Sequence, residues 1–357
     1  MQAWASERFP RAEGEPDSAH LRSTKAKALD LLRGLLPAAS LSHMGIFGSG
    51  QAYEQLLLRL LASPLPEAHE IAAMILTELK ATMPSFVARV DRPERGGEWI
   101  GYLEQRAAAA RRWSERLGLD RARDGQGSGP SVSLLSVEGS EDDLLAALLF
   151  EGGAASEAEA RKAVRALPPD ERATMLAELV GERRNRRHRP GRGLEALRYR
   201  FEVVSDYGAF RDLQRHRMLT IQWQTLTPDL GAGVPDELGE AGVADAYRAG
   251  LERSRDEHAR LVGSGLAELA PYALCLGYRI RYVLDMNARE AMHLIELRSG
   301  REGHPGYRAV AHELHAQIAS VHPAVAAMMK HVDSDTEPRL ERILSEIRTH
   351  ARQAASS

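Results

Sequence analysis

The segment DYGAFRDLQRHR ends in three adjacent residues that are cationic or can become so: Arg215, His216 and Arg217. They close a short predicted helix and precede the extended stretch MLTIQWQTLTP. Side chains of this kind hold a diphosphate or another compact anion through charge-assisted hydrogen bonds. The triplet alone is a weak signal, because arginine pairs at helix ends are commonly solvated. Its surroundings strengthen the prediction of an anion site.

A second group of polar residues follows a predicted strand and comprises Asn287, Arg289, His293 and Arg298. Asn287 and Arg298 are 11 residues apart, about three helical turns, and therefore share one helix face. Beside them, Ala291 and Leu294 could floor an apolar slot for a ring system. We predict that this helix contributes to the same binding site.

The composition is that of an ordinary globular protein. Over 357 residues, 47 Lys and Arg stand against 50 Asp and Glu, so the net charge of −3 gives no general attraction to nucleic acid or membranes. We expect no membrane span and no signal peptide, because long apolar runs are absent. The single cysteine, Cys275, excludes an internal disulfide and fits a reducing cytoplasm. Without a P-loop or G-x-G-x-x-G motif, a nucleotide would be held by arginines.

The hydrophobic pattern predicts an α+β fold with strands mixed among segregated helices. Alternation predicts strands at 132–137, 197–204, along MLTIQWQTL and at 277–285, the last with Tyr278, Ile280, Tyr282 and Leu284 on one face. We expect helices at about 140–151, 156–166, 169–186, 206–215, 240–264, 287–299, 306–321 and 338–354.

The predicted domains are a disordered tail at 1–24, a helical region at 25–118, a Gly/Ser-rich linker at 119–130 and the α+β domain at 131–357. Prolines 66 and 84 bound a helix in the first half, and prolines 305 and 323 bound one in the second half at the same spacing. The helical region is therefore either the remnant of a second copy of the domain or an unrelated helical hairpin.

From about residue 131 to 333 the chain resembles the flavin-dependent thymidylate synthases. Their signature R-H-R-x-x-S-x-N-E-x-S-x-R-Y falls on RHRMLTIQWQTLTP, residues 215–228. Their upstream E-H-x-x-F-x-F-E falls on EALRYRFE, residues 195–202, and their A-R-x-x-L-P falls on APYALC, residues 270–275. Their N-x-R-x-x-x-H-F-L-x-L-R falls on residues 287–298.

The resemblance implies a bound FAD and a homotetramer with flavin sites at the subunit interfaces. It also implies the reductive methylation of dUMP to dTMP, with methylenetetrahydrofolate giving the carbon and NADPH reducing the flavin. Arg215, His216, Arg217, Asn287, Arg289 and His293 match cofactor-binding positions, whereas Arg298 and Thr225 match positions near the substrate phosphate. No catalytic residue is assigned.

Most of the family's motif residues that surround the substrate nucleotide are replaced in this chain. The motif Ser-x-Arg is Thr225-Leu226-Thr227, the second phosphate arginine is Pro271, and the motif glutamate is Trp223. The upstream histidine is Ala196. Two lost arginines would cost about 3–6 kcal/mol of nucleotide binding, at about 1.5–3 kcal/mol each. The chain is therefore either a synthase of weak or altered activity or a catalytically silent structural or regulatory paralogue.

Two further clusters leave alternatives open. The basic run at 183–192 (RRNRRHRPGR) is a solvated helix end, a phosphate-capturing element of the active site or, least favoured for want of stacking aromatics, a nucleic-acid contact. Histidines 304, 312, 315, 322 and 331 crowd the last helices. No cysteine or H-E-x-x-H pattern accompanies them, so we expect ordinary histidines and no metal site.

Overall fold

A computed structural model describes residues 1–119 and 129–356, so most of the predicted linker at 119–130 lies outside the described residues. The chain divides into two compact units. The sheet unit comprises Met1–Leu36, Gly127–Ser254 and Leu274–Ser357, and the helical unit comprises Pro37–Gln126 and Arg255–Ala273. The predicted domain boundaries remain a prediction.

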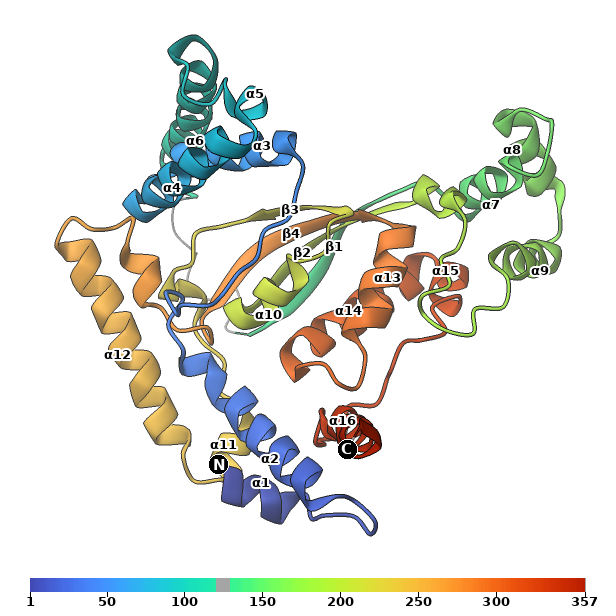
Figure 1. Ribbon diagram of the computed structural model, residues 1–357. Coiled ribbons are helices and arrows are strands. Elements are labelled where there is room, and N and C mark those ends of the chain that lie inside the picture. The colour runs from blue at the N-terminus through green and yellow to red at the C-terminus, as the bar shows by residue number, and fades with distance from the viewer. Residues whose placement is uncertain (120–128, 357) are drawn as a thin grey trace. The chain divides into compact units, whose positions relative to one another are not determined.

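The sheet unit is built on four antiparallel strands in the order β1-β2-β4-β3 (Figure 1). Their bounds are β1 Ser131–Glu138, β2 Arg198–Asp206, β3 Leu219–Trp223 and β4 Arg279–Asn287. Each predicted strand is present, and the α+β class is confirmed. The predicted alternation in β4 is also confirmed, since Ile280, Tyr282 and Leu284 are at most 2% exposed.

One face of the sheet is covered by α10 (Tyr207–Leu213), α13 (Ala288–Arg298) and α14 (Pro305–Val321) (Figure 1). Against them the central strands β2 and β4 bury alternate residues, and Phe201 lies opposite Leu284 in the register. The Tyr199 hydroxyl lies 2.9 Å from Nδ1 of His322, and the Tyr282 hydroxyl lies 3.0 Å from Oγ of Ser205, so both buried hydroxyls have hydrogen-bond partners. This packing fixes where α10 and α13 end.

Three helices connect β1 to β2: α7 (Glu141–Phe150), α8 (Glu157–Ala166) and α9 (Pro169–Val180). Capping boxes at Ser140 and Ser156 start the first two. The third predicted helix, 169–186, is too long, because α9 stops at Val180 and Gly181 takes a φ of 71°. Glycine adopts this left-handed conformation at little cost and ends the helix. The basic run is therefore a loop rather than a helix end.

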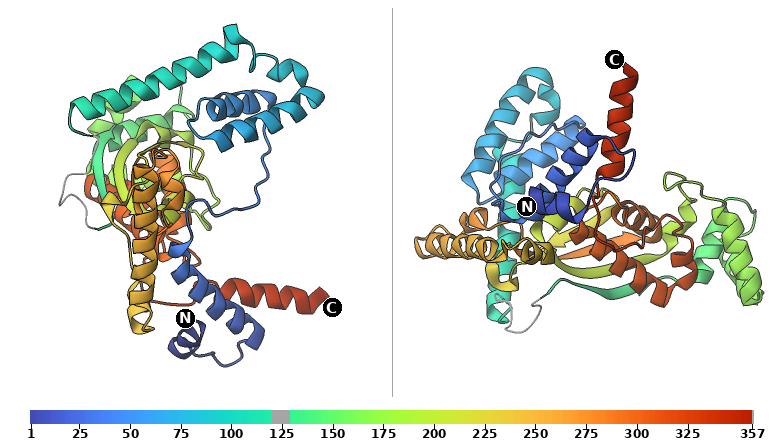
Figure 2. Two further views of the ribbon diagram at one scale, coloured as in Figure 1. Left: turned by 90° about the vertical axis from the view of Figure 1, so that its left-hand side faces the viewer. Right: turned by 90° about the horizontal axis from the view of Figure 1, so that it is seen from below.

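The first residues of the chain are helical where a disordered tail was predicted. Helices α1 (Gln2–Arg8) and α2 (Asp17–Leu32) occupy this stretch, and Ala5 and Ala19 are fully buried. Lys27 Nζ donates to Glu341 Oε1 at 2.7 Å, and α2 packs against α16 (Ile343–Ser356) (Figure 2). Small apolar residues spread through a polar segment are a weak sequence signal, which explains the difference.

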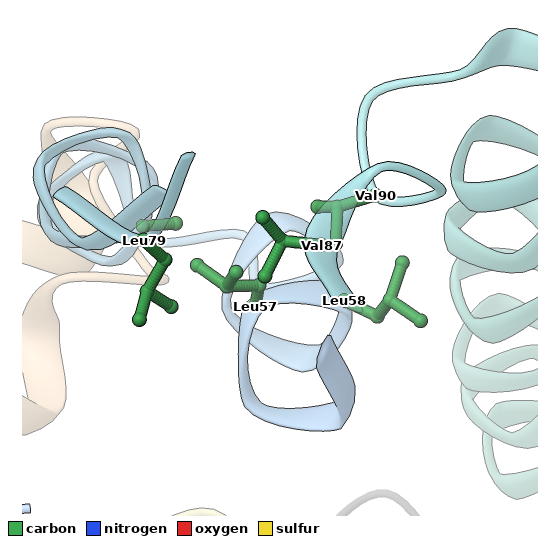
Figure 3. Close-up of a cluster of buried hydrophobic side chains, with 6 residues drawn as sticks. Leu57, Leu58, Leu79, Val87 and Val90 are labelled. Atoms are coloured by element: carbon green, nitrogen blue, oxygen red, sulfur yellow. The ribbon is translucent and has the colours of Figure 1, made fainter. Parts of the chain in front are cut away.

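The helical unit holds α3 (Gly50–Leu61), α4 (Pro66–Thr82), α5 (Pro84–Val87) and α6 (Glu98–Arg116). Its core consists of Leu57, Leu58, Ala72, Leu79, Val87 and Val90 (Figure 3). Both α4 and α14 have 17 residues, begin at a proline and are followed by a short helix that also begins at a proline, α15 (Pro323–Ala327) in the second case. The repeat stays a prediction, and this likeness favours it.

The remaining elements are α11 (Asp236–Glu240), α12 (Ala244–Gly263), a π-helix at Pro93–Gly97 and 3₁₀ turns at Arg33–Leu35, Arg192–Ala196, Pro228–Leu230 and Ala270–Ala273. Among the described residues, we find no helix that combines the length and the apolar character needed to cross a bilayer.

Replacing Phe201 by alanine should destabilise the sheet unit by about 3–5 kcal/mol, because the ring is fully buried between β1 and β4 and its loss leaves a cavity. Leu135→Ala is the control, since Leu135 in β1 is 51% exposed and should change stability by less than about 0.5 kcal/mol. Denaturant unfolding followed by circular dichroism measures both. Equal effects of the two substitutions would contradict this packing.

Candidate functional site

A cavity of about 370 Å³ in the sheet unit brings the predicted site residues together. The triplet, the start of α13 and the basic loop form its walls. Its lining consists of Arg183, Arg186, His188, Arg189, Pro190, Glu195, Arg215, His216, Arg217, Met218, Asn287, Arg289, Glu290, Met292, His293, Leu297 and Arg298.

Helix α10 positions the triplet Arg215-His216-Arg217 at the cavity. Asp206 caps its first turn by accepting from the Ala209 amide at 2.7 Å, and the helix ends at Leu213, two residues before Arg215. A turn at Gln214 and Arg215 and a bend at Arg217 and Met218 then lead into β3. His216 is buried, whereas Arg215 and Arg217 are exposed. The two guanidinium groups are therefore available to a ligand, and the histidine is not.

A buried chain of hydrogen bonds fixes His216. Its Nδ1 lies 2.8 Å from Glu290 Oε1, and its Nε2 lies 3.0 Å from Arg298 Nε. Because a guanidinium can only donate, Nε2 accepts and Nδ1 carries the hydrogen that it donates to Glu290. Arg298 also donates to the Asp212 carbonyl at 2.5 Å and lies over the Tyr307 ring at 5.3 Å. His216 and Arg298 thus hold the wall in place.

The start of α13 is fixed in a similar way. Asn287 is its N-cap and accepts from the Glu290 amide at 2.9 Å. Arg289 donates to the Pro190 carbonyl and to Glu195 Oε1, both at 3.2 Å. Both side chains line the cavity, but their main contacts are within the protein.

Arg183 anchors the basic loop. Its side chain is 4% exposed and forms a two-pronged ion pair with Glu296 of α13, at 2.7 and 2.6 Å. It also donates to the His188 carbonyl at 2.8 Å. A planar guanidinium matches a carboxylate in this geometry, and a buried partner of this kind is costly to remove. The loop is therefore tied to the helix that carries His293.

The cavity arginines fall into two classes. Arg183, Arg289 and Arg298 are bound to acids or carbonyls of the protein. Arg215 has one ion pair, to Asp212 at 3.3 Å, with its side chain 69% exposed, and such surface pairs contribute little. Within the described part of the chain, Arg186, Arg189 and Arg217 are exposed and have no side-chain hydrogen bond or ion pair. The cavity thus has an excess of uncompensated positive charge.

His293 lies beside His216 and within electrostatic reach of Arg186 and Arg189 of the basic loop. Its ring centroid lies 5.4 Å from that of His216. Withdrawal of water by the surrounding protein lowers the pKa of His293, Glu290 opposes this, and His216, Arg186 and Arg189 lower the pKa further. At neutral pH the ring is a neutral hydrogen-bonding group rather than a further cation.

His216, Glu290 and His293 could also be considered as metal ligands, since their ligand atoms lie within 4.8 Å of one another. Both ring nitrogens of His216 are already bonded, to Glu290 and to Arg298. A metal ion would have to displace one partner and enter a cavity of uncompensated positive charge. The electrostatics favour an anion at this position.

Most of the predicted site residues lie at the cavity, but one does not. The six predicted cofactor residues and Arg298 line the one cavity, whereas Thr225 is exposed and does not. The predicted apolar slot on Ala291 and Leu294 is wrong, because both are fully buried in the core. Met218, Met292 and Leu297 give the cavity its apolar wall instead.

Sequence reasoning missed Glu290 and the role of Arg183. The pattern Asn287 followed by Glu290 is a helix-start signal, so the glutamate would be assigned to capping. The other five crowded histidines do not line the cavity; His312 and His315, for example, lie beside backbone carbonyls.

Comparisons with known proteins give the family of the chain. Residues 146–324 match the family described as thymidylate synthase complementing protein. A UPF0159 protein of Chlamydia muridarum is 34% identical over 98% of this chain and 66% of its own length. A UPF0159 protein of Thermoplasma acidophilum is 31% identical over 92% of this chain and 64% of its own length. The chain spans just under two thirds of the length of these curated relatives.

Among solved structures, the UMP/dUMP methylase PolB from Streptomyces cacaoi, bound with 5-Br dUMP, is similar to 58% of this chain and 98% of its own. The sequence identity is 19% and the TM-score is 0.46.

The imidazole of His293 should titrate below the ordinary histidine pKa of about 6.5, as followed by its proton resonances in NMR. Arg189→Gln should raise that midpoint, because it removes a neighbouring positive charge that disfavours the imidazolium. Arg253→Gln, an exposed change on α12 outside the cavity, should leave it unchanged. A midpoint that does not respond to Arg189→Gln would place the basic loop away from His293.

Proposed function

We propose, from the premise that this chain belongs to the thymidylate synthase complementing protein family, that its arginine-lined cavity binds a flavin. FAD is the form proposed, with its diphosphate on Arg215 and Arg217. The observation that supports this most directly is the convergence of the six predicted cofactor residues on one cavity with unpaired guanidinium groups. A diphosphate is the kind of anion that such groups bind through paired hydrogen bonds.

The cavity fits part of a dinucleotide. Its volume of about 370 Å³ is near the lower end of the range for ligand pockets, about 300–1,000 Å³. Met218, Met292 and Leu297 offer an apolar surface for a ring, and His293 a neutral hydrogen-bonding group beside it. We propose that the remainder of the ligand lies outside and is covered by a second copy of the chain, in a homotetramer.

A bound flavin would supply the redox chemistry, and the protein would supply binding and orientation. Arg215 and Arg217 neutralise the diphosphate. Glu290 and Arg298 hold His216 in one orientation, and so keep the two arginines on either side of it directed into the cavity. The proposed overall reaction is reductive methylation of dUMP with methylenetetrahydrofolate and NADPH, in a cytoplasmic enzyme.

A second candidate is a catalytically silent paralogue that retains the flavin. It is favoured by the position of Thr225, which is exposed and outside the cavity. It is also favoured by Arg298, whose guanidinium is already bonded to the Asp212 carbonyl and to His216. The two residues expected at the substrate phosphate are thus displaced or engaged elsewhere.

Arg217→Ala should abolish flavin retention and leave the fold intact, because Arg217 is exposed and makes no contact that stabilises the chain. The purified wild-type protein should show flavin absorbance, and the variant should be colourless with an unchanged circular dichroism spectrum. Arg253→Ala, an exposed change on α12, should stay yellow. A variant at position 217 that still copurifies with FAD would refute the assignment of the triplet.

Tritium release from labelled dUMP, in the presence of the folate and NADPH, separates an active from a silent protein. We expect weak or absent release, because the glutamate and the upstream histidine of the family pattern are replaced by Trp223 and Ala196. Release at the rate of an ordinary family member would show that the reaction does not need a glutamate or a histidine at these two positions.

A further inference from the structure

The basic loop, residues 183–192, is held as a defined wall of the cavity. Arg183 ties it to Glu296, His331 Nε2 lies 3.0 Å from the Arg183 carbonyl, and Arg289 donates to the Pro190 carbonyl. These contacts come from α13 and from the segment after α15. A loop fixed at both ends presents its remaining side chains in a constant direction.

Some arginines of the loop line the cavity, and others point away from it. Arg186 and Arg189 line the cavity. Arg184 pairs with Glu182 at 3.1 Å outside the cavity, and Arg187 is exposed and also outside it. Arg192 is also outside the cavity and pairs with Glu195 at 3.1 Å, so the loop carries two arginines toward a ligand and three toward solvent.

The positive charge exceeds what one diphosphate needs. Four cavity arginines are free or nearly so: Arg186, Arg189, Arg215 and Arg217. A diphosphate diester carries about two negative charges, and Arg215 with Arg217 balances it. About two positive charges then remain, on Arg186 and Arg189 of the basic loop, and a phosphomonoester with a charge of about −1.5 to −2 would balance them.

We infer that Arg186 and Arg189 form a second anion subsite that binds the phosphomonoester of a nucleotide substrate. This inference rests on the proposed function, since it assigns Arg215 and Arg217 to the flavin. The ligand would lie with its phosphate on the basic loop and its base toward His293 and the flavin. Arg183 is a positioning residue for this subsite, because it acts only through the loop.

The geometry favours a small phosphorylated molecule over a nucleic acid. The two arginines face a cavity of about 370 Å³ rather than an open stripe, and the loop carries no aromatic residue for base stacking. The net charge of −3 supplies no general attraction to a polymer either.

The test compares two double variants of the same loop in the flavin-loaded protein. Arg186→Gln with Arg189→Gln removes the cavity-facing charges, and Arg184→Gln with Arg187→Gln removes two of the solvent-facing ones. Both lose the same net charge, so the general field of the protein changes equally. Flavin content, measured by absorbance after release, and dUMP affinity, measured by isothermal titration calorimetry, are recorded for each.

We expect the cavity-facing variant to keep its flavin and to bind dUMP on the order of 10- to 100-fold more weakly than wild type. The solvent-facing variant should resemble wild type in both measurements. Deoxyuridine, which lacks the phosphate, should bind all three proteins with equal affinity, and inorganic phosphate should compete with dUMP only where Arg186 and Arg189 are present.

Three outcomes would overturn the inference: loss of flavin in the cavity-facing variant, equal weakening in both variants, or wild-type protein that binds neither dUMP nor phosphate. Loss of flavin would assign the two arginines to the cofactor instead. Failure of the proposed function is seen separately, as wild-type protein that does not take up FAD. In that case the same dUMP titrations on the flavin-free protein test whether Arg186 and Arg189 bind the phosphate.

Discussion

The site depends on one buried chain of hydrogen bonds, from Glu290 through His216 to Arg298. Glu290 and Arg298 stand at opposite ends of α13, and His216 comes from the turn after α10, so the chain joins two helices that both pack on the sheet. A buried polar group is costly unless it is hydrogen-bonded, and here each donor in the chain faces an acceptor. The histidine at the centre of the triplet is thus structural, and its neighbours are left for a ligand.

The fold could be predicted from the sequence where the hydrophobic periodicity was strong. Ile280, Tyr282 and Leu284 alternate cleanly, and β4 forms where they predict it. The same reasoning failed at the first helices, because Ala5 and Ala19 contribute little hydrophobic signal although they are fully buried. It also extended α9 past Gly181, whose position at a helix end is a recognised stop signal.

Only part of the site could be predicted from the sequence. The triplet and the Asn287-x-Arg289 motif could be found by their spacing, and they do meet in one cavity. The basic loop reaches that cavity through the ion pair of Arg183 with Glu296, residues 113 positions apart in the chain. No local pattern reveals such a pair. Nor could it show that Ala291 and Leu294 would turn to the core while Met292 and Leu297 line the cavity.

The four exposed cavity arginines, of which only Arg215 has an ion pair, have a consequence for the protein when no ligand is bound. Like charges held around one small cavity repel one another, and the fold must carry that repulsion as a loss of stability. An anion that enters relieves the strain and binds only the folded chain, so occupancy and melting temperature rise together. Ligand supply would then set how long the polypeptide survives in the cell, because unfolded molecules are the ones that proteases remove.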